Sequence, residues 1–95
     1  MKMYKKETTV CNPTGLHARP AAQFANTAKQ FESKVFVRNL SSEGRSDPGN
    51  AKSIISILTL GMGQGTRIEI SAEGEDEQSA VDTLISLVDA GFGEV

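Results

Sequence analysis

The sequence predicts an α+β fold, an open-faced sandwich in which a four-stranded antiparallel sheet is covered on one face by two long helices and one short helix. Residues 66–72 alternate apolar and polar side chains, which is typical of a strand with one face in solvent. Two segments, near residues 21–31 and 80–88, instead carry apolar side chains at helical spacing. A chain of 95 residues can bury one such core, so we expect a single domain over 1–95.

The first strand is expected over Tyr4 to Val10, where two threonines and a valine alternate weakly with polar residues. The cluster Asn12-Pro13-Thr14-Gly15 is a turn that ends it. A helix follows, and Pro20 fits its first turn because the missing N–H of proline costs nothing there. Its apolar stripe predicts an end near residues 31–32 and consists of Ala21, Phe24, Ala25, Ala28 and Phe31.

The middle of the chain is less clearly patterned. Residues 35–38 read as a second strand, and the polar stretch 40–50 as a loop holding one short edge strand. For residues 53–61, the β-branched content favours a strand, whereas Ser53 and Gly61 at the ends favour a short helix. If this segment is a helix, Ile57 and Leu60 can fill the core, and its other apolar side chains are partly exposed: Ile54, Ile55 and Leu58.

The end of the chain has a clear strand and a clear helix. Ile68, Ile70 and Ala72 mark the inner face of the strand 66–72. Acidic residues at 73–76 then precede the helix, which Gly91 closes, and residues 92–95 are expected to be a tail. The helical stripe comprises Ala80, Val81, Leu84, Ile85, Leu87 and Val88.

Composition excludes several classes of protein. No run approaches the ~20 apolar residues of a membrane span, so we expect no membrane insertion. No apolar segment follows the lysines of residues 1–7, which is unlike a signal peptide, so we expect a cytoplasmic protein. A net charge of −2 argues against a nucleic-acid partner, although Arg19 and Lys52 could together form a local positive patch. The single cysteine, Cys11, excludes an intrachain disulfide.

His17 is the only histidine and stands where the first helix begins. Unpaired backbone N–H groups and roughly half a positive charge at a helix start bind anions. A neutral imidazole nitrogen there can accept a phosphoryl group, and the Arg19 guanidinium can bond its oxygens in a fork. The alternative is that His17 is an ordinary surface residue or helix cap, which most lone histidines in such positions are. Since one cysteine and no second histidine are present, we expect neither a metal site nor a cofactor.

Three segments closely resemble the HPr family, the histidine-containing phosphocarriers of the bacterial sugar phosphotransferase system: Thr14–Ala21, Lys52–Ile55 and Leu60–Gly65. The resemblance implies that His17 takes a phosphoryl group on Nδ1 from phosphorylated enzyme I, with phosphoenolpyruvate as the original donor, and passes it to the EIIA domains of sugar permeases. It assigns Arg19 to holding the group, Pro20 to the helix start, and the amides of Ala18 and Arg19 to the anion cradle. A carrier of this kind is not an enzyme, and we expect it to be a monomer.

The resemblance also matches Ser53 to the serine that an HPr kinase/phosphorylase modifies in the Gram-positive branch of the family. This kinase and a transcriptional regulator are further partners that the resemblance implies. A serine at a helix start is equally explained by capping, so both interpretations stay open. The resemblance also implies that partners dock across the first and short helices. It predicts a contact surface of Ile54, Ile55 and Leu58, with Phe24 or Ala22 at its margin and Lys52 on its rim. The loop 40–50 looks several residues longer than in the family.

Two alternatives to the carrier remain. An HPr-like regulatory module would control its partners by binding, with its phosphorylation state setting affinity. A self-contained small enzyme or metal-binding domain is disfavoured because neither paired carboxylates nor a glycine-rich phosphate loop followed by lysine accompanies His17.

Overall fold

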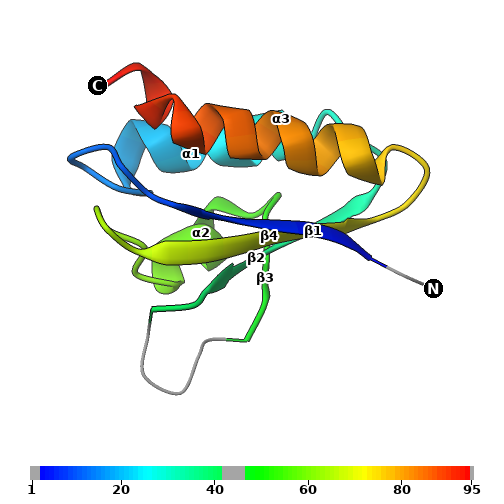
Figure 1. Cartoon of the computed structure of the whole chain (residues 1–95), viewed down its shortest axis with the longest axis horizontal. Helices are drawn as coiled ribbons and strands as arrows, with labels where there is room; N and C mark the ends of the chain where they lie inside the picture. Colours follow the sequence, from blue (N-terminus) through cyan, green and yellow to red (C-terminus); the bar gives the residue numbers. More distant parts are fainter. Residues whose placement is uncertain (1–2, 42–46, 95) are drawn as a thin grey trace.

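The computed structural model describes residues 3–41 and 47–94 and confirms the predicted open-faced sandwich. Within these ranges the helices α1 and α3 pack together above one face of a four-stranded antiparallel sheet (Figure 1). The shorter α2 packs against α1 and β3. The elements, in chain order, are β1 (Tyr4–Thr9), α1 (Ala18–Ala28), β2 (Lys34–Asn39), β3 (Gly49–Asn50), α2 (Ile54–Thr59), β4 (Arg67–Glu73), α3 (Glu77–Asp89) and the 3-10 helix η1 (Gly91–Gly93).

The strand order in the sheet is β1-β4-β2-β3, so the last strand in the sequence occupies an interior position. On one side β4 pairs with β1, with Ile68 opposite Thr8, and on the other it pairs with β2, with Ile70 opposite Val37. The predicted alternation of β4 is confirmed, because its apolar side chains are buried. The first and second strands are therefore joined only through β4.

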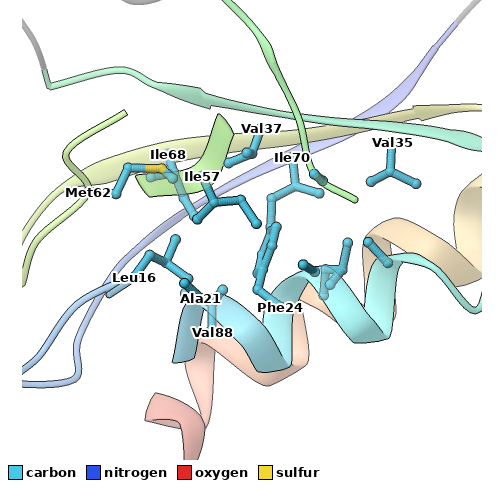
Figure 2. Packing of buried hydrophobic residues seen from close by; sticks show 14 of the residues in the cluster. Leu16, Ala21, Phe24, Val35, Val37, Ile57, Met62, Ile68, Ile70 and Val88 are labelled. Carbon is cyan, nitrogen blue, oxygen red and sulfur yellow. The ribbon is translucent and has the colours of Figure 1, made fainter. Parts of the chain in front are cut away.

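The core lies between the sheet and the helices (Figure 2). The helical spacing predicted for α1 and α3 turns one stripe of each inward, while α2 contributes Ile57. Burying a side chain the size of Ile, Leu or Phe stabilises the fold by roughly 1.5–3 kcal/mol. The buried side chains shown as labelled sticks are Leu16, Ala21, Phe24, Val35, Val37, Ile57, Met62, Ile68, Ile70 and Val88.

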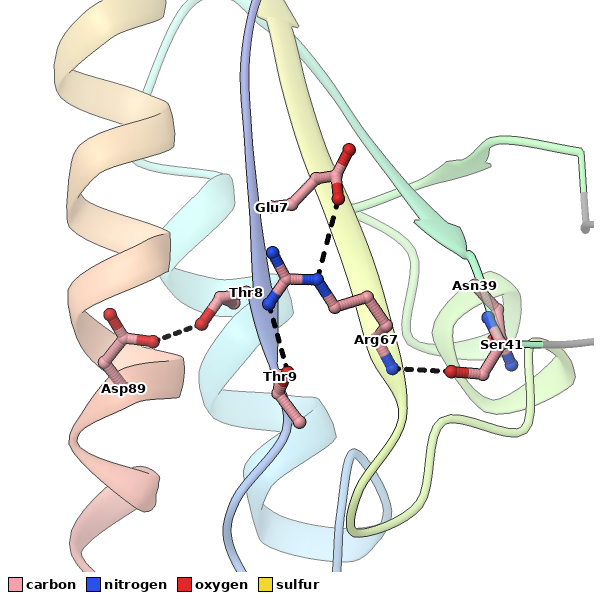
Figure 3. A network of polar contacts seen from close by, with 7 residues as sticks. All are labelled: Glu7, Thr8, Thr9, Asn39, Ser41, Arg67 and Asp89. Atoms are coloured by element: carbon pink, nitrogen blue, oxygen red, sulfur yellow. Dashed lines mark hydrogen bonds and ion pairs between the residues drawn. The ribbon is translucent and has the colours of Figure 1, made fainter.

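The edge strand β1 meets α3 mainly through polar side chains. The Tyr4 hydroxyl donates to Asp82 Oδ1 at 3.0 Å, and Lys6 Nζ lies 2.9 Å from the same oxygen. The hydrogen bond from Lys6 holds the pKa of the Asp82 carboxyl below its usual value. The Thr8 hydroxyl donates to Asp89 (Figure 3). These polar contacts fix α3 across β1.

Polar contacts also fix the start of β4 (Figure 3). The Arg67 backbone N–H donates to Ser41 Oγ at 2.7 Å, and its guanidinium donates to Thr9 Oγ1 at 3.1 Å. Asn39 Oδ1 accepts from the Ser41 N–H, and Asn39 Nδ2 donates to the Leu60 carbonyl at 2.8 Å. These hydrogen bonds connect the ends of β2 and α2 to the beginning of β4. They therefore fix the residues on both sides of the connecting segment 61–65.

Two boundaries differ from the sequence prediction. The helix α1 ends at Ala28, not near residues 31–32, because the N–H groups of Gln30 and Phe31 bond carbonyls three residues back and tighten the chain into turns. Residues 91–94 are not a free tail, since η1 turns the chain back and buries Phe92.

Other expectations are confirmed. Residues 54–59 form a helix, Gly91 follows α3, and the polar stretch contains the short edge strand β3. The central part of that stretch, 42–46, lies outside the described residues. None of the described helices is long and apolar enough to cross a membrane.

Candidate functional site

The turn before α1, residues 12–16, packs against residues 61–65, and we call these the histidine turn and the supporting turn. Gly15 has φ +67°, a conformation that L side chains rarely adopt. A Cβ at Gly15 would lie 2.6 Å from Gly63 Cα and 2.7 Å from the Met62 carbonyl oxygen. The Leu16 N–H donates to that same oxygen at 2.8 Å. Only glycine lets the two backbones approach this closely.

His17 is the N-cap residue of α1, with extended backbone angles and an exposed side chain. Its imidazole makes no hydrogen bond with any of the described residues. No acidic side chain occupies the first turn of α1, so no residue of that turn neutralises the partial positive charge of the helix end. The ring is therefore accessible to a partner and lies beside an end that favours anions.

The residues after His17 shape the start of the helix. Ala18 has φ +52°, which costs a non-glycine residue about 1–2 kcal/mol. The backbone N–H groups of Ala18 and Arg19 lie in the first turn, so they have no carbonyl partner within the helix. Pro20, the third residue of the helix, is buried and has no backbone N–H that needs a partner. The Arg19 side chain is exposed. The amides and the guanidinium that could bind phosphoryl oxygens thus lie at one helix end.

Glu94 joins this region from the far end of the chain, which the sequence did not predict. Its carboxylate accepts hydrogen bonds from Asn12 Nδ2 at 3.0 Å and from the Thr14 hydroxyl at 2.8 Å. These bonds, with a smaller effect of the positive charge of Arg19, hold the pKa of the Glu94 carboxyl below its usual value. The only hint in the sequence is Phe92, an aromatic residue in a segment otherwise typical of a tail.

The helix α2 carries the predicted apolar surface. The side chains of Ile54, Ile55 and Leu58 are 38%, 78% and 42% exposed, whereas Ile57 is fully buried. We call the three exposed side chains the α2 patch. Ser53 is the N-cap residue, and its hydroxyl accepts from the Ser56 N–H at 3.3 Å. The helix α2 therefore directs Ile57 into the core and the α2 patch toward solvent, as expected if residues 53–61 form a helix.

The structure contradicts two expectations: that Phe24 borders the contact surface, and that Arg19 and Lys52 form a positive patch. Phe24 does not lie at the margin of that surface, because its side chain is fully buried and points into the core (Figure 2). Lys52 does not form a positive patch with Arg19. Its Nζ donates at 2.7 Å to the carbonyl of Phe31, beyond the carboxyl end of α1, and this 11-residue helix separates that end from His17 by about 16 Å.

Metal ligation has no visible basis in residues 3–41 and 47–94, where no three His, Cys, Asp or Glu side chains gather in a group that could hold an ion. Cys11 is partly buried, and its thiol points to the Val88 carbonyl at 3.5 Å.

Comparison with known proteins agrees with this geometry. Residues 4–90 match the family model described as PTS HPr component phosphorylation site. The phosphocarrier protein HPr of Haemophilus influenzae is 46% identical over 86 residues, which cover 90% of this chain and 95% of that protein. A multiphosphoryl transfer protein of Salmonella typhimurium is 40% identical over 93% of this chain, which matches only 23% of that longer protein. The crystal structure of HPr-C-His from Thermoanaerobacter tengcongensis has a TM-score of 0.88 and 41% identity, covering 97% of this chain and 98% of that one. The chain therefore belongs to the HPr family and is a phosphocarrier of the phosphotransferase system.

Proposed function

We propose that His17 is the residue on which this phosphocarrier holds its phosphoryl group, through Nδ1. The observation that carries the proposal is an exposed imidazole at the amino end of α1, without a side-chain hydrogen bond to any described residue. In the transfer, the lone pair of the neutral ring nitrogen bonds to phosphorus while the bond from phosphorus to the donor breaks. The amides of Ala18 and Arg19 and the Arg19 guanidinium bind the phosphoryl oxygens. Pro20 keeps the helix start in place.

Enzyme I loads His17 in this proposal, and EIIA domains unload it. The protein has no turnover of its own and works as a monomer, so each transfer takes place inside a short-lived complex. The α2 patch offers such partners an apolar contact close to the helix α1 that carries His17.

Phosphorylation with purified enzyme I and labelled phosphoenolpyruvate tests this proposal. The wild-type chain should acquire an acid-labile label only when enzyme I is present. His17→Ala should acquire none while its circular dichroism spectrum is unchanged, and Arg19→Ala should be labelled more slowly. A label that persists in His17→Ala would place the acceptor elsewhere. An unlabelled wild-type chain would favour the alternative, a regulatory binding module.

We also propose that Ser53 is a site of regulatory phosphorylation, read by a transcriptional regulator. Its hydroxyl is half-buried at the start of α2, beside the exposed Ile54, so a phosphate there adds about −1.5 to −2 charges at the edge of the α2 patch. An HPr kinase/phosphorylase with ATP should label the wild-type chain but not Ser53→Ala. Loss of the cap costs Ser53→Ala about 1 kcal/mol, so its folding is checked separately. No difference in labelling between the two chains would leave capping as the whole role of Ser53.

A further inference from the structure

The carboxylate of Glu94 is presented by a segment that is itself anchored. Phe92, two residues earlier, is only 7% exposed, and the Glu94 N–H donates to the Gly91 carbonyl at 2.8 Å. The side chain then reaches the histidine turn, where the Thr14 N–H lies 3.4 Å and the Thr14 hydroxyl 2.9 Å from Oε1. Three donors of the histidine turn, including Asn12 Nδ2, converge on this one group.

The side-chain amide of Asn12 links Glu94 to the backbone of the histidine turn. Its Nδ2 donates both to Glu94 and, at 2.9 Å, to the carbonyl of Gly15. The reverse orientation of the amide would set its oxygen against a carboxylate and a carbonyl, so only this one satisfies both acceptors. Asn12 is fully buried, and its position therefore depends on Glu94 on one side and on Gly15 on the other.

The histidine turn is thus held from two sides. The supporting turn fixes Gly15 and Leu16 from one direction, and Glu94 fixes Asn12 and Thr14 from the other. Both contacts therefore restrain the backbone that leads into His17.

We propose that Glu94 is a positioning residue for His17: by fixing Asn12 and Thr14, its carboxylate holds the histidine turn in the one arrangement that presents the imidazole to a phosphoryl donor. The inference rests on the proposed role of His17 as the acceptor. Glu94 forms no bond to the phosphoryl group and acts only through the turn. Transfer between two proteins needs the attacking nitrogen in line with phosphorus, and small losses of alignment are costly.

The test compares Glu94→Ala with Glu94→Gln, which keeps an oxygen acceptor at the same place. The matched control is Glu75→Ala, an exposed carboxylate just before α3, at the opposite end of that 13-residue helix, about 20 Å away. Two quantities are measured: hydrogen exchange at the amides of Gly15 and Leu16 in the unphosphorylated protein, and KM and kcat of each chain as a substrate of enzyme I.

Glu94→Ala should exchange faster at both amides and lower kcat on the order of tenfold, with KM changed less than about twofold because the α2 patch is untouched. Glu94→Gln should recover most of both losses, and Glu75→Ala should match the wild type. Faster exchange with unchanged kcat would make the contact merely structural and overturn the proposal, as would unchanged exchange. If His17 is not the acceptor, the wild-type chain itself fails to be labelled there, whereas failure of the present inference leaves wild-type labelling intact.

Discussion

Gly15→Ala should be far more damaging than the size of one methyl group suggests. The new Cβ would lie 2.6 Å from Gly63 Cα and 2.7 Å from the Met62 carbonyl oxygen, both backbone atoms that cannot rotate away. Alanine at φ +67° costs about 1–2 kcal/mol by itself. Parting the two turns adds about 1–3 kcal/mol of strain and weakens the 2.8 Å hydrogen bond from Leu16 to Met62, worth about 1 kcal/mol.

We therefore expect Gly15→Ala to lower the free energy of unfolding by about 3–6 kcal/mol, a large part of the roughly 5–15 kcal/mol that stabilises a typical domain. Gly61→Ala is the matched control. Gly61 has nearly the same backbone angle, φ +62°, but a Cβ there meets no atom within 4 Å. It should cost only the conformational part, about 1–2 kcal/mol.

Urea unfolding followed by circular dichroism measures both variants, and labelling by enzyme I measures the effect on His17 acceptance. Gly15→Ala should also be labelled more slowly under conditions where it remains folded, because the histidine turn must move. Equal destabilisation by the two substitutions would refute the reasoning, since it would mean that the close approach of the turns contributes nothing beyond the left-handed backbone.

Further changes separate core, surface and acid-sensitive contacts. Phe24→Ala should lower the free energy of unfolding in urea by about 3–5 kcal/mol, because the ring is buried and not on the contact surface. Ile55→Ser, at a side chain 78% exposed, should leave that free energy within about 0.5 kcal/mol yet weaken enzyme I binding in calorimetry, whereas Ile57→Ala should lose about 2–5 kcal/mol. The pKa of Asp76 is held down chiefly by the hydroxyl of Ser33, so its contribution is complete above the ordinary Asp pKa of about 3.9 and is lost as the pH falls through the lower folded value. Urea unfolding of Asp76→Ala should accordingly differ from wild type at neutral pH and converge on it in acid.

The sequence patterns predicted the regular elements well where one face of an element meets the core. The alternation of β4 and the stripes of α1 and α3 follow from burial on one side, and the structure confirms them. The helical spacing correctly predicted that Phe24 faces the core. The prediction that it borders the contact surface came only from the family resemblance. For residues 53–61 periodicity could not decide, because a short helix packed against α1 buries Ile57 and exposes Ile55.

Contacts between distant parts of the chain could not be predicted in this way. Glu94 and Asn12 are 82 residues apart, and no local pattern records that a carboxylate near the end of the chain accepts from an amide near its beginning. The position of the Lys52 ammonium likewise depends on a free carbonyl beyond α1, which appears only once the helix is known to end at Ala28. The location of His17 at a helix start could be predicted, but the support around its turn could not.

The strand order β1-β4-β2-β3 has a consequence for the time at which this protein becomes competent. His17 is synthesised early, yet the strand that joins β1 to β2 is complete only at Glu73, and the last contact on the histidine turn comes from Glu94. In a chain emerging from the ribosome, His17 is therefore exposed before the supporting turn, β4 and Glu94 can contact the histidine turn. Residues 61–94 must therefore be added and folded before the turn that leads into His17 gains the contacts described above.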